Sequence, residues 1–422
     1  MTARFLQIHT LTSFPATLLN RDDAGQAKRL PFGGTTRTRI SSQCLKRHWR
    51  TAEHAEALRH IELDADGTLS IRSRETFDRY LVEPLEQDGV HPDIAEAVTQ
   101  QIMDQILGLS AATKTKRSDR KKKAEEDGDE AQEAKLTSGQ VTVLGHPEVR
   151  FLREQARAII AENELDESSK KLDAAAKKAV AEHFKKGAKK NLQELSKGTA
   201  MGLDAAMFGR MVTSDILARG DAAIHVAHAF TVHAEDSEPD YFSAVDDLVA
   251  ERGDLGAGHI NTSELTSGLY YGYVVVDVPL LVSNLTGAAR EEWESADRDL
   301  AGEVTRRLVH TIATVSPGAK LGSTAPYARP HLLMIEADDA QPRTLANAFL
   351  DPVAPSRADG LLVHTFRRLA EYVEQIDGAY GGPDARRLLA VGPVDELGAL
   401  GDGRASLADL AGWAGAQVRG AA

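Results

Sequence analysis

A strand-forming segment at the amino end of this chain is separated from every other strand-forming segment by a long helical region. Residues 4–12 are rich in aromatic and branched side chains, which favours a strand, whereas residues 56–204 form long helical stretches rich in Ala, Lys and Glu. Strand-like composition returns only in residues 205–422. Because a lone strand leaves its backbone groups unpaired, we expect it to join strands from the second half. The sequence therefore predicts an α+β domain made of residues 1–55 and 205–422, with 56–204 inserted as a helical lobe.

Short-range patterns in the sequence predict where the individual helices, strands and loops lie. Ser41 and Ser42 offer a helix start, and apolar residues at helical spacing continue the helix from 42 to 60, with Trp49 turned towards a core. The preceding residues, 13–38, contain the turn-forming residues Pro15, Asn20, Gly25, Pro31, Gly33 and Gly34, which predicts a long loop. Further strands are expected at 223–232, 269–282 and 332–336, and further helices at 288–313, 342–350 and 360–377.

Charge is distributed unevenly along the chain. The 422 residues carry a formal net charge of -13. Residues 1–50 nevertheless hold nine basic and two acidic side chains, a local charge of +7, and the other 372 residues carry 41 basic and 61 acidic groups. A surface patch decides what docks on a protein, whereas net charge governs solubility. The amino-terminal segment is therefore a candidate for binding a polyanion.

Two segments of the helical lobe are themselves highly charged. Residues 114–135 hold eight basic and seven acidic side chains in 22 residues and no large apolar one, which predicts a solvated, flexible loop. A nuclear-localisation signal at 117–123 is the less favoured alternative. Residues 170–197 carry nine lysines against three acids. A solvated lysine-rich face is the simpler interpretation of this segment, and an auxiliary polyanion surface is the alternative.

Composition excludes several classes of protein. The single cysteine, Cys44, rules out an internal disulfide framework and a cysteine-based zinc site. The first twelve residues have no apolar core after a basic start, so a secretory signal is not expected. The most apolar stretch, 269–283, is too short to cross a bilayer and is interrupted by Asp277 and Pro279. We expect a cytoplasmic protein without a membrane partner.

The sequence lacks the common enzyme signatures. Residues 317–324 have the composition of a phosphate-binding loop in the wrong order, so a small-molecule enzyme using the turn from Gly318 to Thr324 is a minor alternative. His225, His228 and His233 lie near two acids, but strand alternation would place His228 on the opposite face from the other two. We interpret them as ordinary histidines and expect no metal site and no catalytic residue.

Two adjacent aspartates, Asp22 and Asp23, keep one catalytic alternative open. A metal-dependent nuclease needs convergent acids, and no third ligand can be nominated from the sequence. The simpler interpretation is that Asn20 and the aspartates bond loop backbone and orient the neighbouring arginines. The alternative to a binding function is thus a metal-dependent endoribonuclease that uses Asp22 or Asp23.

Residues 20–50 combine four features that suit a run of phosphates. Glycines allow close backbone approach, paired serines open a helix beside unpaired N–H groups, Gln43 adds an amide, and basic side chains supply charge. Such a site binds the nucleic-acid backbone without reading bases. The candidate phosphate-binding residues are Asn20, Arg21, Lys28, Arg37, Arg39, Ser41, Ser42, Gln43, Lys46, Arg47 and Arg50.

Motifs in one order along the chain resemble the CasC-type backbone subunit of the type I-E CRISPR Cascade complex. They are Asn-Arg-Asp-Asp at 20–23, Phe-Gly-Gly at 32–34, Arg-Ile-Ser-Ser-Gln at 39–43, Leu-Lys-Arg at 45–47, Gly-Arg-Met at 209–211, Ala-His-Ala at 227–229, Tyr-Phe-Ser-Ala-Val-Asp-Asp-Leu at 241–248, Thr-Ser-Gly-Leu-Tyr at 266–270, Pro-Gly-Ala-Lys at 317–320 and Leu-Ala-Asn-Ala-Phe at 345–349.

The resemblance implies a fold and a function. The fold would be an RRM-like palm with an inserted helical fingers domain at 56–204 and a β-hairpin thumb near 230–265. Copies would polymerise along the spacer of a CRISPR guide RNA beside other Cascade subunits, displacing bases periodically so that the guide pairs with target DNA. The subunit itself would not be an enzyme. The resemblance adds Met211, Tyr241, Phe242 and Lys320 to the RNA-binding residues.

The sequence departs from the family pattern at two places. The segment after Gly34 reads Thr35-Thr36-Arg37, where a more basic run is expected, so one phosphate contact is in doubt. The charged loop at 114–135 is the second departure. Related subunits of RNA-targeting complexes cut RNA with a loop aspartate, which is why the endoribonuclease alternative stays open.

Overall fold

The structure is a computed structural model, and it describes residues 3–108, 136–169, 171–195, 197–210, 220–245, 257–318, 324–354 and 359–420. The chain forms two compact units. The first unit contains residues 1–60, 224–279 and 298–422, and the second contains residues 61–223 and 280–297. The expected lobe at 56–204 corresponds to a second unit that runs further, to Ala223, and takes in Leu280–Asp297.

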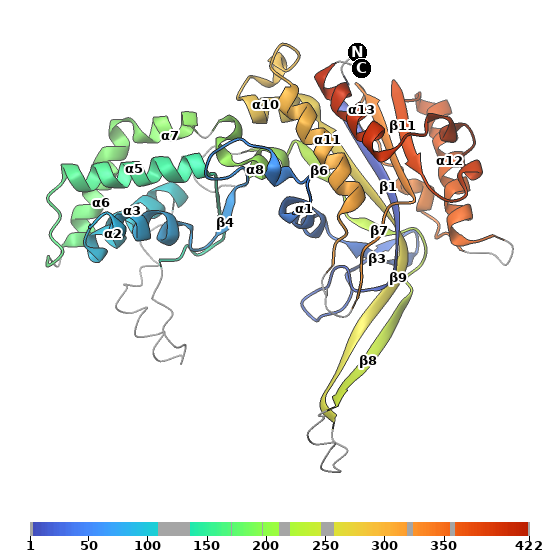
Figure 1. The fold of residues 1–422 in the computed structure, drawn as a ribbon, viewed down its shortest axis with the longest axis horizontal. Coiled ribbons are helices and arrows are strands. Elements are labelled where there is room, and N and C mark those ends of the chain that lie inside the picture. The colour runs from blue at the N-terminus through green and yellow to red at the C-terminus, as the bar shows by residue number, and fades with distance from the viewer. Residues whose placement is uncertain are drawn as a thin grey trace. The chain divides into compact units, whose positions relative to one another are not determined.

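The first unit is built on an antiparallel sheet (Figure 1). Its strand order is β11-β10-β1-β9-β7-β3-β2, with β6 and β8 also paired to β9. The strands are β1 (Phe5–Thr17), β2 (Arg29–Phe32), β3 (Thr35–Ile40), β6 (Ile224–Val226), β7 (Ala229–Thr231), β8 (Ser237–Val245), β9 (Ala257–Asp277), β10 (Leu332–Asp338) and β11 (Ala385–Ala390). The α+β class expected from the sequence is confirmed. The amino-terminal strand does pair with late strands, since β1 lies between β9 and β10.

Helices cover both faces of this sheet. The helix α12 (Leu361–Tyr380) and the 3-10 turns Ala346–Phe349 and Val394–Gly403 close one face over a cluster that includes Leu11, Tyr271 and Met334. On the other side lie α11 (Asp299–Thr314), α13 (Leu407–Arg419) and α1 (Ser42–Thr51) (Figure 1). Gly302 and Gly415 allow α11 and α13 to pack closely, because a Cβ on Gly302 would lie 2.9 Å from the Gly415 carbonyl oxygen.

Several elements differ from those expected. The long loop predicted at 13–38 is in part a two-stranded hairpin, β2–β3, because the Gly33-Gly34 pair adopts positive φ and closes a tight turn. A side chain at Gly33 would collide with the Leu350 backbone. The strand expected at 269–282 ends at Asp277, and α10 (Val278–Thr286) follows with Pro279 in its first turn. Helix α1 ends at Thr51 rather than 60, and Leu58–His60 form a separate 3-10 turn.

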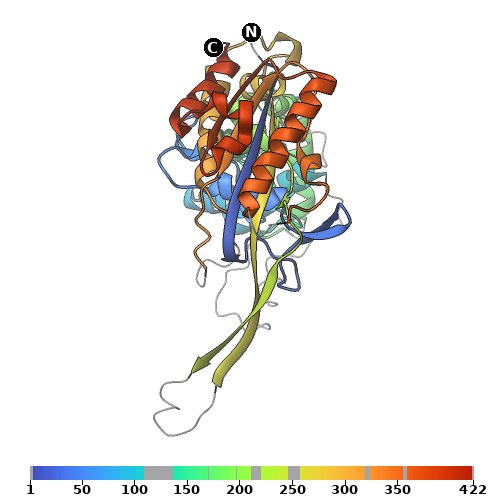
Figure 2. The ribbon, with the colours of Figure 1, turned by 90° about the vertical axis from the view of Figure 1, so that its right-hand side faces the viewer.

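A long hairpin leaves the sheet of the first unit (Figure 2). It consists of β8 and the first half of β9, paired antiparallel from Ser237↔Thr266 to Val245↔Ala257. β9 is 21 residues long, and its second half pairs with β1 inside the sheet. The hairpin is therefore continuous with a central strand.

The second unit is mainly helical. Its helices are α2 (Glu83–Gln87), α3 (Pro92–Leu107), α5 (His146–Glu162), α6 (Leu172–His183), α7 (Lys189–Leu195) and α8 (Leu203–Phe208), joined by π-helical turns at Asp78–Val82 and Phe184–Ala188 and 3-10 turns at Gly198–Met201 and Arg290–Glu292. They enclose an apolar core containing Phe77, Leu85, Ile102 and Leu152. The short strands β4 (Ile71–Ser73) and β5 (Thr142–Leu144) pair beside it. In the parts of the chain described, no helix is long and apolar enough to cross a membrane.

Candidate nucleic-acid interface

Helix α1 presents a basic face on the first unit. Trp49 is buried, and Cys44 and Leu45 pack against the apolar cluster of Phe14 and Tyr270, so this side of the helix is fixed to the sheet. Helical spacing turns the remaining residues outward. Gln43 and Arg47 are exposed, and Lys46 and Arg50 are half-buried. The core position of Trp49 and the outward basic row both follow the expectation from the sequence.

The amino end of α1 is already capped by protein groups. The Ser41 N–H donates to Asn20 Oδ1 at 2.9 Å, the Ser42 N–H donates to His228 Nδ1 at 3.0 Å, and the Cys44 N–H donates to Ser41 Oγ at 3.3 Å. Three of the N–H groups at this helix start, those of Ser41, Ser42 and Cys44, are thus bonded to protein groups. The structure gives Asn20 and the buried Ser41 a capping role. The Ser42 hydroxyl remains near the surface and donates to Gln43 Oε1.

His228 is a part of this cap whose capping role the sequence did not indicate. Its Nδ1 must be unprotonated to accept from Ser42, and Arg39 Nη1 lies 3.4 Å from the same atom. Burial, Arg39 and Lys28 lower the pKa of His228, which favours this neutral acceptor form. From the sequence, His228 was considered as a metal-ligand candidate and as part of the Ala-His-Ala resemblance. Its capping role was missed because helix capping by a distant histidine leaves no local spacing signal.

Arg37 does not face solvent, which corrects its expected role in phosphate binding. Its side chain is 0% exposed. The guanidinium donates to the carbonyl oxygens of Thr231 and Phe349, both at 3.0 Å, and Nε donates to Thr35 Oγ1 at 2.9 Å. Burial lowers the pKa of Arg37, and the neighbouring Arg368 lowers it further. In this conformation Arg37 joins β3, β7 and the turn after Ala346 rather than contacting a ligand.

The segment between Asn20 and β2 is fixed by backbone and acidic contacts. The Lys28 N–H donates to the Asn20 carbonyl oxygen, and Asp22 Oδ1 accepts from the Gln26 N–H, both at 2.9 Å. The Ala27 N–H donates to the buried Glu264 of β9 at 2.7 Å. Asn20 and Asp22 therefore bond loop backbone, as the simpler interpretation predicted. Asp23 is exposed.

Arg29 has a role that the sequence analysis missed. It pairs with Glu235 and with Glu264, which anchors the segment to the base of the β8–β9 hairpin. Its charge is thereby matched inside the protein. Only its place among nine basic residues was visible in the sequence, and the two acids come from more than 200 positions later.

Several cations around α1 have no such match. Within the described parts of the chain, no carboxylate lies within 4.0 Å of four of them: Arg21, Lys28, Arg39 and Arg47. The same unit pairs several of its other arginines with acids, for example Arg306 with Glu303 and Arg386 with Glu336. Unmatched cations on one surface attract anions, with an attraction that salt screens.

The first two acids after α1 in the sequence form ion pairs with arginines outside this helix. Glu53 pairs with Arg59 at 3.0 Å, and Glu56 pairs with Arg306 at 2.7 Å. The hydrogen bond from Arg306 outweighs the effect of burial and lowers the pKa of Glu56, so this carboxylate stays charged and paired with Arg306. Glu53 and Glu56 are the first acids that follow Lys46, Arg47 and Arg50 in the sequence. Each of these two carboxylates is therefore paired with an arginine outside α1.

The remaining predicted residues lie on other segments. Tyr241 lies on β8 and is 64% exposed. Phe242 follows it in the strand, paired with Asn261 in the backbone ladder. Met211 and Lys320 lie outside the described residues. The start of the Lys320 loop is described, and the Gly318 N–H donates to His48 Nε2 of α1 at 3.3 Å.

The histidines and acids do not form a metal centre where the structure describes them. No group of three or more His, Cys, Asp and Glu side chains converges as metal ligands in the described ranges. His225 and His228 are exposed, and His233 is held by backbone groups of Ala234 and Leu269.

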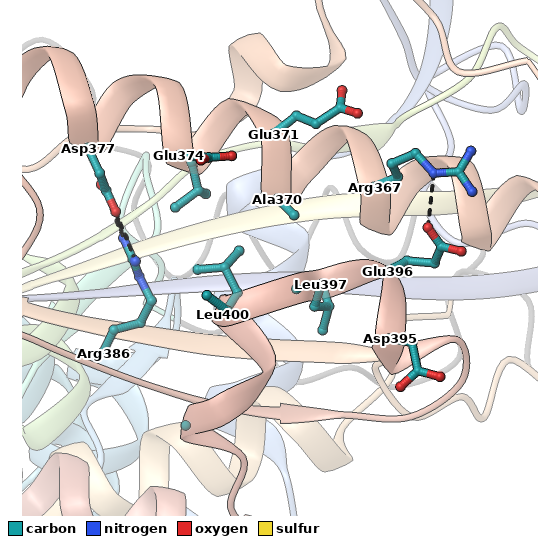
Figure 3. A pocket seen from close by; sticks show the side chains of 14 residues that line it. Arg367, Ala370, Glu371, Glu374, Asp377, Arg386, Asp395, Glu396, Leu397 and Leu400 are labelled. Atoms are coloured by element: carbon teal, nitrogen blue, oxygen red, sulfur yellow. Dashed lines mark hydrogen bonds and ion pairs between the residues drawn. The ribbon is translucent and has the colours of Figure 1, made fainter.

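A separate cavity on α12 has the wrong charge for phosphate. It has a volume of about 640 Å³ and lies between α12 and the turn Val394–Gly403 (Figure 3). Glu371, Glu374 and Asp395 line it, and its two arginines are paired, Arg367 with Glu396 and Arg386 with Asp377. Carboxylates at this density repel a nucleic-acid backbone. This cavity is therefore not a candidate phosphate site.

Comparisons with known proteins agree over nearly the whole chain. Residues 6–413 match the family model described as CT1975-like protein. A solved chain titled "CRISPR RNA-guided surveillance complex, pre-nicking" is similar with a TM-score of 0.71 and 25% identity, covering 99% of this chain and 100% of that chain. A chain titled "CRISPR RNA-guided surveillance complex" shares the fold, with a TM-score of 0.62 and 22% identity over 97% of this chain and 99% of the other. No curated protein matches the sequence.

Proposed function

Because this chain belongs to the CT1975-like protein family, we propose that it is a guide-RNA-binding subunit of a Cascade-type CRISPR surveillance complex. The similarity to a subunit of such a complex over the full length of both chains supports the proposal. The observation that carries it is the basic surface around α1, where Arg21, Lys28, Arg39 and Arg47 have no carboxylate partner in the described structure. A surface on which four cations have no carboxylate partner in the described structure suits a bound polyanion.

The proposed mechanism is to hold the RNA by its backbone. Long, exposed cations contact phosphates whatever the sequence. The guide's base edges then stay available, and pairing with target DNA carries the specificity, as in other RNA-guided systems. The protein then has to supply positive charge at suitable positions and needs no side chain that reads the bases.

The finer points of the proposal concern assembly. We propose that the first unit is an RRM-like palm, the second unit the fingers and the β8–β9 hairpin the thumb, as in a type I-E backbone subunit. Copies would line up along one guide, with the hairpin of each copy reaching the RNA held by its neighbour. The exposed Tyr241 on the hairpin supports an aromatic contact there. Met211, Phe242 and Lys320 stay predicted RNA contacts.

We propose that the subunit is not catalytic. Asp22, the first acid of the endoribonuclease alternative, accepts a hydrogen bond from the Gln26 N–H within a tight turn. This contact supports a structural role. Incubation of the purified chain with RNA and magnesium separates the two functions, since the nuclease predicts cleavage that Asp22→Asn or Asp23→Asn abolishes.

The test of the binding surface is a double substitution, Lys46→Ala with Arg50→Ala. Both residues lie on the outward side of α1. Each lost phosphate contact should lower the slope of log affinity against log salt by about 0.7 for single-stranded RNA, so about 1.4 for the pair. Filter binding of a single-stranded RNA between 50 and 200 mM salt measures this slope.

A matched control is Lys177→Ala with Lys178→Ala on α6. Both lysines are exposed, so this variant loses the same charge from a different surface, the one considered as an auxiliary polyanion site. We expect the parent slope from this control. Equal slopes for the parent, the α1 variant and the control would contradict the assignment of α1.

A further inference from the structure

Residues 315–318 and 324–331, the described parts of the segment from Val315 to His331, are attached to α1 and to each other. Besides the contact from Gly318 to His48, the Ser316 hydroxyl and the Ala328 backbone exchange two hydrogen bonds, at 3.0 and 3.2 Å, which join the two described parts. Ala328 packs against the same apolar cluster as Cys44 and Leu45 of α1. The described ends of this segment are thus fixed to the helix that carries the basic face.

His48 is held in one tautomer by these contacts. Its Nδ1 lies 2.8 Å from the Cys44 carbonyl oxygen and must donate to it, which leaves Nε2 free to accept from the Gly318 N–H. His48 is adjacent in sequence to Arg47, one of the cations without a carboxylate partner in the described structure. The segment therefore approaches α1 beside the candidate RNA surface.

Tyr327 projects from this anchored segment into solvent. Its side chain is 80% exposed. Pro326 before it is buried and Ala328 after it is packed, so the backbone on both sides is fixed while the ring is not covered. Arg329, two residues later, is also exposed, and its guanidinium donates to the Thr314 carbonyl oxygen. The exposed ring of Tyr327 therefore stands on a backbone that is held beside α1, with the exposed Arg329 two residues further along the chain.

That combination is how proteins hold single-stranded RNA. Bases stack on aromatic faces while neighbouring cations follow the phosphates, and the stacking tolerates any base because every base has a π-face. We propose that Tyr327 is a stacking platform for a base of the single-stranded RNA whose phosphates lie along α1. This inference rests on the proposed function and adds a base contact to a surface so far described by charge alone.

The experiment compares two ligands and two tyrosines. The ligands are a single-stranded RNA and an abasic ribose-phosphate oligomer of the same length. The variants are Tyr327→Ala, Tyr327→Phe and, as matched control, Tyr380→Ala, which removes a tyrosine that is 86% exposed at the end of α12. Affinities for both ligands are measured with the full chain at one salt concentration.

We expect Tyr327→Ala to weaken RNA binding by about tenfold, the range of one stacked base, and to leave binding of the abasic oligomer unchanged. Tyr327→Phe should keep the parent affinity, because it keeps the ring. Tyr380→Ala should match the parent for both ligands. A 4-thiouridine RNA should also form a photo-cross-link at Tyr327, identified by mass spectrometry.

Two results would overturn the inference. One is an RNA affinity of Tyr327→Ala within twofold of Tyr380→Ala. The other is an equal loss for RNA and for the abasic oligomer, which would mean that the substitution acts on the surface charge or the fold. A parent chain that binds neither ligand would instead overturn the proposed function, and the inference with it.

Discussion

A single arginine shows how misleading a basic residue can be on its own. Arg37 lies between Thr36 and Thr38 in β3. Because residues 1–50 carry a local charge of +7, its position in the sequence suggests a phosphate contact. Its guanidinium instead satisfies carbonyl oxygens of β7 and of the turn after Ala346. It also lies 5.8 Å from the centre of the Phe32 ring. Arg37 is therefore a structural cross-link in the core of the first unit.

Replacing Arg37 should cost stability and not RNA affinity. Arg37→Met leaves several buried carbonyl oxygens without donors, so we expect the free energy of unfolding to fall by about 3 kcal/mol. Urea denaturation measures the change, and RNA affinity is measured at a temperature where the variant is folded. Arg47→Met is the matched control, with stability within about 0.5 kcal/mol of the parent and weaker RNA binding. The reverse pattern would restore Arg37 to the binding surface.

At the scale of single elements, the hairpin offers the clearest test of assembly. Tyr241 on β8 is exposed and belongs to a strand pair that leaves the sheet. If the hairpin reaches the RNA of a neighbouring copy, Tyr241→Ala should leave affinity for an RNA long enough for one copy unchanged. It should reduce the number of copies bound to a longer RNA, measured by mass photometry. Tyr380→Ala serves again as control, and equal copy numbers for both variants would contradict the proposed thumb.

Local sequence signals predicted some elements well and others poorly, for physical reasons. The start of α1 and the burial of Trp49 were predictable because capping serines and apolar spacing are local. The β2–β3 hairpin was missed because turn-forming Pro and Gly residues dominate a segment whose strands are only four and six residues long. The end of β9 was predicted too late in the chain. Residues 278–282 continue the apolar run, and a short apolar run does not distinguish a strand from a helix.

The candidate site divides in the same way. The basic row on α1 follows from helix geometry and was predictable. The capping by His228, the pairing of Arg29 and the burial of Arg37 were not, because each depends on residues about 190 or more positions away. Such contacts are decided by the packing of β7 and β9 against the amino-terminal segment.

At the scale of the whole molecule, a network of ion pairs around a buried carboxylate links β10 of the sheet to α12. Glu336 on β10 is fully buried, accepts from Arg386 at 2.9 Å and lies 3.8 Å from His9 Nε2. Arg386 and Arg343 both pair with Asp377 of α12. Burial alone would raise the pKa of Glu336, but His9 and Arg386 outweigh it and hold the pKa at about 2.

This network predicts a loss of stability in acid. The pKa of Glu336 is lower in the folded chain than the ordinary value of 4.5, so its contribution is present above about pH 4.5 and is lost as the pH falls towards 2. The urea midpoint of the parent should therefore fall between pH 6 and pH 3. Glu336→Gln should show a smaller fall, with Glu303→Gln as a control for another carboxyl of low pKa. The same fall in Glu336→Gln as in the parent would contradict this account.

The length of β9 has a mechanical consequence. Thr266 pairs with Ser237 of the hairpin and with Thr17 of β1, so the two ladders meet on one uninterrupted strand. At about 3.3 Å per residue, 21 residues extend roughly 70 Å. The strand passes from the hairpin into the sheet as one element, with a register shift against β8 between Ala244 and Val245. If copies line up as proposed, with the hairpin of each copy reaching its neighbour, the length of β9 would set the distance between neighbouring copies.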